Sequence, residues 1–202
     1  GRTGTLFAYE TCGIRPDIIA VAKGLGGGFP VGAVIASAEV GNAMTPGTHG
    51  STFAGNPLAM AVSEAVLDTL TAPGFLADVR RRAAILQDAL QKIADRHPGQ
   101  IDSIRGRGFL RGVRLGPSLD AGAIVAALRD HRLLTAPAGE NTVRFLPPLI
   151  ISEEEIALAA VAEEPQALIE APEAPEAPAK PRRRQRRPQP ASRPDAHLAL
   201  CT

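Results

Sequence analysis

The spacing of apolar residues divides the chain into three stretches. Residues 1–72 hold short apolar runs separated by glycines, residues 73–162 alternate between helical and strand periods, and residues 163–202 show no apolar period. A chain of 202 residues is long enough for one large domain or two small ones. The pattern therefore predicts two structured domains, at 1–72 and 73–162, followed by a tail.

The first stretch is typical of a glycine-rich α/β region. The run at 18–22 is short and β-branched, which indicates a buried strand, and a second apolar run follows at 31–36. A short helix is expected at 39–44. The polar segment at 45–56 is long enough for a loop that is either functional or disordered.

A helix follows this loop. Asn56 is a favourable N-cap and Pro57 suits the first helical position. The segment 58–70 is rich in alanine, leucine, valine and methionine, so we expect a largely buried helix.

The second stretch predicts a compact α+β unit. Apolar residues in 75–96 recur every three or four positions, as on an amphipathic helix. After it we expect strands at 101–105 and 109–115, a helix at 122–132, strands at 133–135 and 142–146, and a last helix capped by Ser152 and Glu155. The mixture of helices and antiparallel strands distinguishes this unit from the α/β region before it.

The tail differs in composition from the rest. A Glu-Ala-Pro repeat at 170–178 precedes a run with six basic residues between Lys180 and Arg187. Such a segment cannot bury a core, so we expect disorder. It is either a flexible appendage, a reading-frame artefact, or a basic arm that binds nucleic acid or another acidic surface. No aromatic residues interleave with it, which argues against stacking on single strands.

Composition and charge narrow the function classes. The net charge of +1 gives no support for a nucleic-acid partner of the whole chain. Cys12 and Cys201 lie far apart and outside any metal-binding spacing, so we expect neither a disulfide scaffold nor a metal site, and a cytoplasmic protein. No apolar run reaches the length of a membrane span. The chain begins at Gly1 without a signal peptide, and we expect it to be part of something longer.

One lysine suggests chemistry. Lys23 ends the apolar run at 18–22 and is followed by four glycines in five positions. Burying an ammonium group is costly, and desolvation lowers the pKa of a lysine and frees an amine that can form a Schiff base with an aldehyde. The glycines would let the backbone pass close to a flat cofactor or adopt positive φ. The alternative is a lysine whose amine reaches solvent beside a flexible turn, and the residues alone leave both open.

Longer motifs extend this interpretation. They are Gly1-Arg2-Thr3-Gly4, Ala22 to Ala33, Gly47 to Ala59, and Val143-Arg144-Phe145-Leu146-Pro147-Pro148. With these stretches the chain resembles the C-terminal half of the class III pyridoxal-phosphate aminotransferases, most closely their acetylornithine group. The resemblance covers residues 1–160 in unbroken order. It implies a partial large domain of the fold type I transferases, followed by the small α+β domain.

The resemblance assigns candidate site residues. Lys23 matches the lysine that holds pyridoxal phosphate and transfers protons, and Thr52 matches a threonine that contacts the cofactor phosphate of the partner subunit. A homodimer with shared active sites is therefore implied. Ser51 matches a substrate-side position, and Arg144 lies where related enzymes place an arginine near the substrate carboxylate. Weaker candidates are Arg2, Arg105 and Arg107, and we interpret His49 as structural.

The implied reaction transfers the terminal amino group of N-acetylornithine to 2-oxoglutarate, in arginine biosynthesis. Ornithine, succinylornithine and 4-aminobutyrate are alternative donors, and a non-catalytic fragment with a nucleic-acid-binding tail is the alternative from another class. The family's phosphate-binding turn, its ring-stacking aromatic residue, a substrate arginine and the aspartate that pairs with the pyridine nitrogen have no match here. We therefore expect the chain alone to be inactive, with much apolar surface exposed on residues 1–70.

Overall fold

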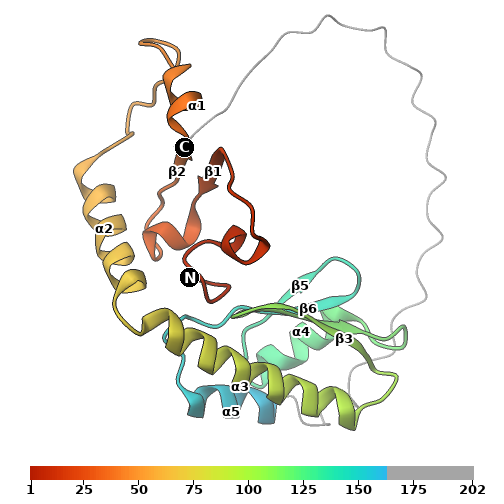
Figure 1. Cartoon of the computed structure of the whole chain (residues 1–202). Coiled ribbons are helices and arrows are strands. Elements are labelled where there is room, and N and C mark those ends of the chain that lie inside the picture. Colours follow the sequence, from red (N-terminus) through yellow and green to blue (C-terminus); the bar gives the residue numbers. More distant parts are fainter. Residues whose placement is uncertain (163–202) are drawn as a thin grey trace, which may run out of the picture. The chain divides into compact units, whose positions relative to one another are not determined.

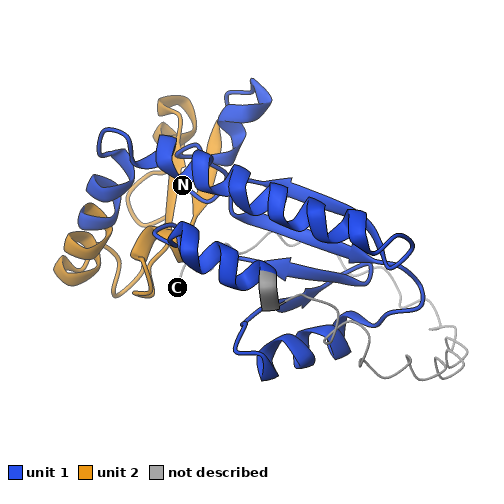
Figure 2. Ribbon diagram, turned by 90° about the horizontal axis from the view of Figure 1, so that it is seen from below, with its two compact units in different colours: residues 1–16, 65–174 blue, residues 17–64, 175–202 orange. Residues whose placement is uncertain are grey.

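The computed structural model describes residues 1–162, and they form two compact units (Figure 1, Figure 2). The C-terminal unit consists of residues 1–16 and 65–162, and the lysine unit consists of residues 17–64. The domain boundary at residue 72 stays a prediction. The structure adds that the first sixteen residues belong with the C-terminal unit. The expectations for the tail concern residues outside those described.

The C-terminal unit is built on an antiparallel sheet of four strands. In the order in which they lie, these are β3 (Ile101–Arg107), β4 (Leu110–Leu115), β6 (Thr142–Phe145) and β5 (Ala136–Ala138). The register places Val113 opposite both Ile104 and Val143, so apolar side chains line one face of the central strands.

Helices cover that apolar face. They are α3 (Phe75–Arg96), α4 (Ala121–Asp130) and α5 (Glu153–Ala162). Val79, Leu86 and Leu90 of α3 pack in the same core as Phe109, Val143 and Ile156. Figure 2 shows α3 and α5 lying along the sheet. The predicted α+β unit is confirmed, with α3 beginning and ending where its period predicts.

One predicted strand is displaced. We expected residues 133–135 to be extended, but β5 begins at Ala136. Arg132 has a left-handed φ of 64°, which ends α4, and the Leu133 N–H then bonds back to the Leu128 carbonyl at 2.9 Å. The chain must leave the helix before it can join the sheet.

The lysine unit contains little buried structure. Its elements are β1 (Ile18–Val21), the 3-10 helix η2 (Lys23–Gly26), β2 (Ala33–Ala36), α1 (Ala38–Asn42) and the first half of α2 (Pro57–Thr71). Within residues 17–64 the fully buried positions are Gly26, Ala59 and Ser63, all of them small.

The prediction of a buried strand at 18–22 is wrong for this chain. In β1 exposed and half-buried residues alternate, and Ile18 is 57% exposed. Within the described residues β1 pairs with β2 alone. A two-stranded ribbon has too little apolar area around it to bury either face.

The helix after the loop has the predicted ends but not the predicted burial. Asn56 caps α2 by accepting a hydrogen bond from Ala59 N–H at 2.9 Å. Leu58, Met60 and Leu67 are nevertheless exposed. The expectation of a largely buried helix is therefore wrong, whereas the expected exposure of apolar surface is confirmed. Among the helices that the structure describes, none is both long and apolar enough to cross a bilayer.

Candidate active site

Lys23 stands at the turn directly after β1. Its φ is 53°, a left-handed conformation that is uncommon for a residue with a side chain and costs about 1–3 kcal/mol. The side chain is exposed and, in the described part of the chain, forms no hydrogen bond or ion pair. The expected desolvated amine is therefore not what the structure has. The amine is accessible and available for bonding, on a backbone that is held in a strained conformation.

Glycines make the turn after Lys23 possible. Gly27 and Gly28 have φ values of 56° and 119°, so the expectation of positive φ is confirmed at these two positions. Gly26 is buried, and a Cβ added there would lie 2.7 Å from Val31 Cγ1. At Gly26 the backbone therefore packs closely against the protein's own Val31, so the glycine-rich turn after Lys23 folds back on itself.

The loop before α2 presents Ser51 and Thr52. Hydrogen bonds from Ala54 N–H to the Ser51 carbonyl and from Asn56 N–H to the Phe53 carbonyl, each 3.3 Å, define two successive turns. The hydroxyls of Ser51 and Thr52 are exposed and form no hydrogen bond within residues 1–162. Both remain free to donate to a ligand.

Two further features of this loop bear on its role. Phe53 is 79% exposed. His49 is exposed as well and has no polar contact to any described residue, so the structure gives no support for a structural role of this histidine. The loop therefore offers an aromatic ring and several polar groups that its own chain leaves unused.

Arg144 lies on the open face of the four-stranded sheet, opposite the helices. Its neighbours in register are Gly112 on β4 and Ala136 on β5, both too small to crowd a guanidinium. The side chain is exposed and has no ion pair in the part of the chain that the structure describes. Arg144 is therefore available to an anion from outside.

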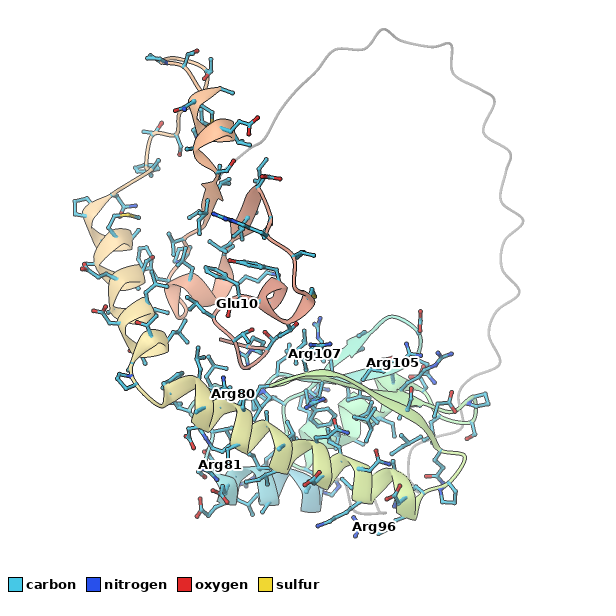
Figure 3. All side chains as sticks on the ribbon, viewed as in Figure 1. Glu10, Arg80, Arg81, Arg96, Arg105 and Arg107 are labelled. Atoms are coloured by element: carbon cyan, nitrogen blue, oxygen red, sulfur yellow. The ribbon has the colours of Figure 1, made fainter. Side chains whose placement is uncertain are left out.

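The weaker arginine candidates differ in how far they are engaged (Figure 3). Arg105 forms an ion pair with Glu140 at 3.0 Å, while Arg107 is exposed. Arg2 donates from Nη1 to the Pro147 carbonyl, and partial burial lowers the pKa of its guanidinium. Arg2 thus serves the fold of the C-terminal unit, while Arg107 makes no polar contact to a described residue.

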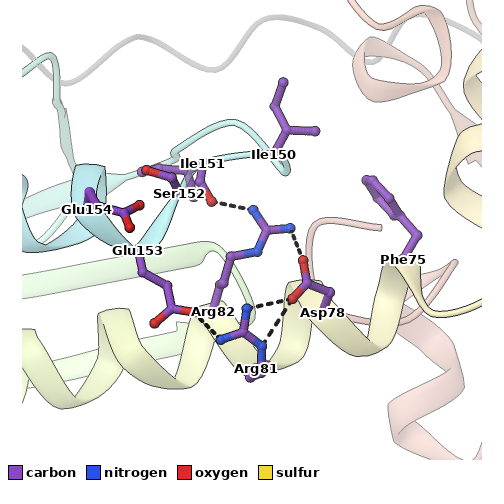
Figure 4. Close-up of a pocket in the computed structure, with 9 residues that line it drawn as sticks. All are labelled: Phe75, Asp78, Arg81, Arg82, Ile150, Ile151, Ser152, Glu153 and Glu154. Atoms are coloured by element: carbon purple, nitrogen blue, oxygen red, sulfur yellow. Dashed lines mark hydrogen bonds and ion pairs between the residues drawn. The ribbon is translucent and has the colours of Figure 1, made fainter.

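A pocket between α3 and α5 is lined by charged residues that bind one another (Figure 4). The buried Arg82 pairs with Asp78 at 2.7 Å and donates to the Ile151 carbonyl. Arg81 bonds to Asp78 at 2.8 Å and to Glu153. Hydrogen bonding to Arg81 lowers the pKa of Asp78, and hydrogen bonding to Glu153 raises the pKa of Arg81. The network joins two helices, so we interpret it as structural.

Sequence reasoning missed the role of Asn141 in the β5–β6 hairpin. Asn141 has a φ of 52°, and its side chain accepts from Ala121 N–H at 2.9 Å and donates to the carbonyls of Leu119 at 2.8 Å and Gly116 at 3.2 Å. It therefore ties the hairpin to the start of α4. The Gly139-Glu140-Asn141 sequence between two strands was the available signal, because asparagine tolerates left-handed backbone.

The candidate residues are distributed over both units. Lys23, Ser51 and Thr52 lie in the lysine unit, and Arg144 lies in the C-terminal unit. No hydrogen bond or ion pair joins the side chain of Lys23 to Ser51 or Thr52. A lysine amine, two hydroxyls and an arginine, all unengaged by described residues, are the groups that an aldehyde, a phosphate and a carboxylate would need.

Comparison with known proteins identifies relatives of this chain. A family model described as "Aminotransferase class-III" matches residues 1–162. Acetylornithine aminotransferase 1 of Bradyrhizobium diazoefficiens is 49% identical over 156 residues, which are 77% of this chain and 38% of that protein. The chain thus spans about two fifths of the length of the curated relatives that it matches.

Solved structures of aminotransferases also resemble this chain. An ornithine aminotransferase from Toxoplasma gondii, described as having partial occupancy of PLP at its active site, is similar with a TM-score of 0.74 and 36% identity, covering 80% of this chain and 38% of that one. An acetylornithine aminotransferase from Elizabethkingia anophelis gives a TM-score of 0.73 and 33% identity, covering 80% and 41%. The partial type I transferase fold expected from the sequence is thereby confirmed.

Proposed function

The chain belongs to the class-III aminotransferases, which depend on pyridoxal phosphate, and from this we propose that it forms the lysine-bearing C-terminal part of such an enzyme. The observation that carries the proposal is the 49% identity to an acetylornithine aminotransferase across three quarters of the chain. The accessible amine of Lys23 on its strained turn supports it from the structure.

The proposed reaction transfers the terminal amino group of N-acetylornithine to 2-oxoglutarate. The products are an aldehyde and glutamate, and the reaction would serve arginine biosynthesis. The names of the curated relatives support the donor. We propose 2-oxoglutarate as the acceptor on the resemblance described above.

The residues present fit the cofactor. A primary amine binds an aldehyde covalently, and Lys23 offers an amine without a partner among the described residues. A phosphate needs hydrogen-bond donors, and Thr52 offers an exposed hydroxyl. Pyridoxal phosphate supplies the carbonyl that accepts the amino group and the ring that delocalises the electron pair left by proton removal.

In this proposal Lys23 has two tasks. Its amine first anchors the cofactor. Once the amino donor has replaced it, the free Nζ would take the proton from the carbon that bears the donor's amino group and pass it to the carbon that was the cofactor's aldehyde. The left-handed turn at Lys23 and the glycines after it fix the backbone from which the amine approaches.

Arg144 would bind a substrate carboxylate, and Ser51 would contact the substrate. A guanidinium offers two parallel N–H donors to a carboxylate, and the small neighbours of Arg144 leave that side of the sheet open.

We propose that the working protein has about the length of the relatives. The remaining cofactor and substrate contacts would come from residues beyond this chain. Thr52 would reach the cofactor of a second copy, which makes the enzyme a homodimer with shared active sites. We place it in the cytoplasm, in keeping with two cysteines that are far apart in the sequence.

Borohydride reduction tests the proposal. The protein of the relatives' length is incubated with pyridoxal phosphate, reduced, digested and mapped by mass spectrometry. We expect a pyridoxyl adduct on Lys23 and none on Lys92, an exposed lysine of α3 that serves as the matched control. A protein that binds the cofactor but carries no adduct on Lys23 would refute the proposal.

Ornithine is a second candidate donor. The ornithine aminotransferase of Toxoplasma gondii and the acetylornithine enzyme of Elizabethkingia anophelis resemble the chain equally, with TM-scores of 0.74 and 0.73. The ratio of kcat/KM for N-acetylornithine to that for ornithine decides between them. A ratio above one supports the first donor, and a ratio below one supports ornithine.

A further inference from the structure

The first four residues form a strap across the C-terminal unit. The N-terminal strap (residues 1–4) bonds to three elements that are distant in sequence. Arg2 donates from Nη1 to the carbonyl of Pro147, its own carbonyl accepts from Phe109 N–H at 2.9 Å, and the Gly4 carbonyl accepts from Arg80 Nη1 at 2.7 Å. The partners lie after β6, before β4 and on α3, so the strap connects the ends of two paired strands to a helix.

Two glycines make room for the strap. Gly108 has a φ of 56°, and a Cβ added there would lie 2.4 Å from the Arg2 carbonyl oxygen. Gly4 has a φ of 88°, and a Cβ there would lie 2.6 Å from Arg80 Cγ. Backbone conformation and close contact both demand glycine at these positions, so the strap is built into the unit rather than resting on its surface.

Arg2 uses its charge in an unusual way. Partial burial lowers the pKa of its guanidinium, and no ion pair with a carboxylate of residues 1–162 offsets that cost. What it binds is the carbonyl of Pro147. A hydrogen bond from a charged donor is stronger than a neutral one, so this contact fixes the carbonyl firmly.

The Pro147 carbonyl lies close in sequence to Arg144, the arginine that we propose to bind a substrate carboxylate. Pro147 follows Arg144 by three residues, at the point where β6 has ended at Phe145. On the other side, β6 pairs with β4 through Gly112 and Arg144, and β4 begins one residue after Phe109, to which the strap also bonds. The strap therefore restrains both the end of the strand that carries Arg144 and the start of its neighbour.

We propose that Arg2 is a positioning residue, which holds the end of β6 so that Arg144 meets substrate carboxylates in a fixed orientation. The inference rests on the proposed carboxylate-binding role of Arg144. Arg2 does not touch the substrate. Its removal would let the segment after Phe145 move, and a guanidinium that must present two parallel donors loses affinity when its backbone shifts.

The test measures binding of glutarate, a non-reacting dicarboxylate, by calorimetry to the protein of the relatives' length loaded with pyridoxal phosphate. We expect Arg144→Ala to raise the Kd by about a hundredfold and Arg2→Ala by about tenfold, the size of one charged hydrogen bond. The double variant should bind like Arg144→Ala alone, because Arg2 acts through Arg144. Arg2→Lys should recover part of the loss.

Arg80→Ala is the matched control. It removes the strap contact at Gly4 and leaves the contact at Pro147, so the Kd should stay within about twofold of the parent, a change well below 1 kcal/mol. Thermal unfolding of each variant shows whether it is folded, and Arg2→Lys carries the test if Arg2→Ala does not fold.

The outcomes separate the two claims. If Arg144→Ala weakens glutarate binding and Arg2→Ala does not, the positioning role is wrong and the proposed function stands. If the effects of the two single variants multiply in the double variant, Arg2 does not act through Arg144. If Arg144→Ala leaves the Kd unchanged, the carboxylate-binding role of Arg144 is wrong, and the positioning role fails with it.

Discussion

The two units differ in how much apolar surface each of them buries by itself. The C-terminal unit encloses a core of aliphatic side chains, Phe109 and Phe145 between its sheet and three helices. The lysine unit buries only small residues, and Ile18, Val34 and Phe53 are exposed. Yet the lysine unit holds the residues proposed to bind the cofactor.

This difference shows how chemistry and stability are divided along the chain. The C-terminal unit has the apolar contacts that allow independent folding, since its buried apolar side chains form one core cluster. The lysine unit has strained and accessible groups and a two-stranded ribbon. Such a segment needs further structure around it, and a longer protein of the kind we propose would supply that structure.

We expect the largest effect from replacing Lys23, which lies in the lysine unit. In the proposed full-length enzyme, Lys23→Ala removes both the anchoring amine and the proton carrier, so kcat should fall by at least about a thousandfold. Because the Lys23 side chain forms no hydrogen bond or ion pair with a described residue, the melting temperature without cofactor should stay the same. Steady-state kinetics and calorimetry measure the two quantities, and Lys92→Ala is the control. Parent-like kcat in Lys23→Ala would contradict the assignment.

A pair of leucines tests the contrast in packing. Leu86 of α3 is 4% exposed and Leu58 of α2 is 62% exposed. Leu86→Ala should lower the free energy of unfolding by about 2–5 kcal/mol because it leaves a cavity in the core. Leu58→Ala should change it by no more than about 0.5 kcal/mol. Urea denaturation of the 202-residue chain measures both. Equal effects would break the comparison.

The latch formed by the Asn141 side chain, which ties the β5–β6 hairpin to α4, predicts a smaller effect inside the C-terminal unit. Asn141→Gly keeps the left-handed backbone but removes three side-chain hydrogen bonds, and should cost about 1–3 kcal/mol of unfolding free energy. Glu140→Gly, beside it, also keeps a positive φ and loses exposed ion pairs with Arg105 and Arg114, which are worth no more than about 1 kcal/mol. Chemical denaturation compares the two. A larger loss in Glu140→Gly would show that the latch is assigned to the wrong residue.

The smallest predicted effect concerns pH. Hydrogen bonding to Arg81 lowers the pKa of Asp78 in the folded state. The contribution of the ionised Asp78 to the free energy of unfolding is therefore fully present above the unfolded-state pKa of about 4. It is lost as the pH falls through the lower folded-state pKa. In Asp78→Asn, the free energy of unfolding of the C-terminal unit should therefore depend less on pH in this acidic range. An unchanged slope in Asp78→Asn would contradict the assignment.

Local features of the fold could be predicted from the sequence. The period of α3 set both of its ends, and the caps at Asn56 and Ser152 depend on neighbours three residues away. Burial could not be predicted in the same way. The run at 18–22 is apolar enough for a core strand, but its burial depends on what packs against it, and the described chain offers one partner strand.

For the candidate site, the sequence indicated which residues matter but not how they are held. Lys23, Thr52 and Arg144 were found through motifs. The accessible amine, the left-handed turn at Lys23 and the bond from Arg2 to a carbonyl 145 residues away depend on tertiary structure. No local pattern contains a contact across that separation.

Hydrogen exchange of the 202-residue chain, followed by mass spectrometry, tests the contrast between the units most directly. We predict that the amides of α3 and β4 exchange at least about a thousandfold more slowly than those of β1 and β2, because only the former surround a buried apolar core. Equal protection of β1 and β2 would mean that the lysine unit is stable by itself, and would contradict the account.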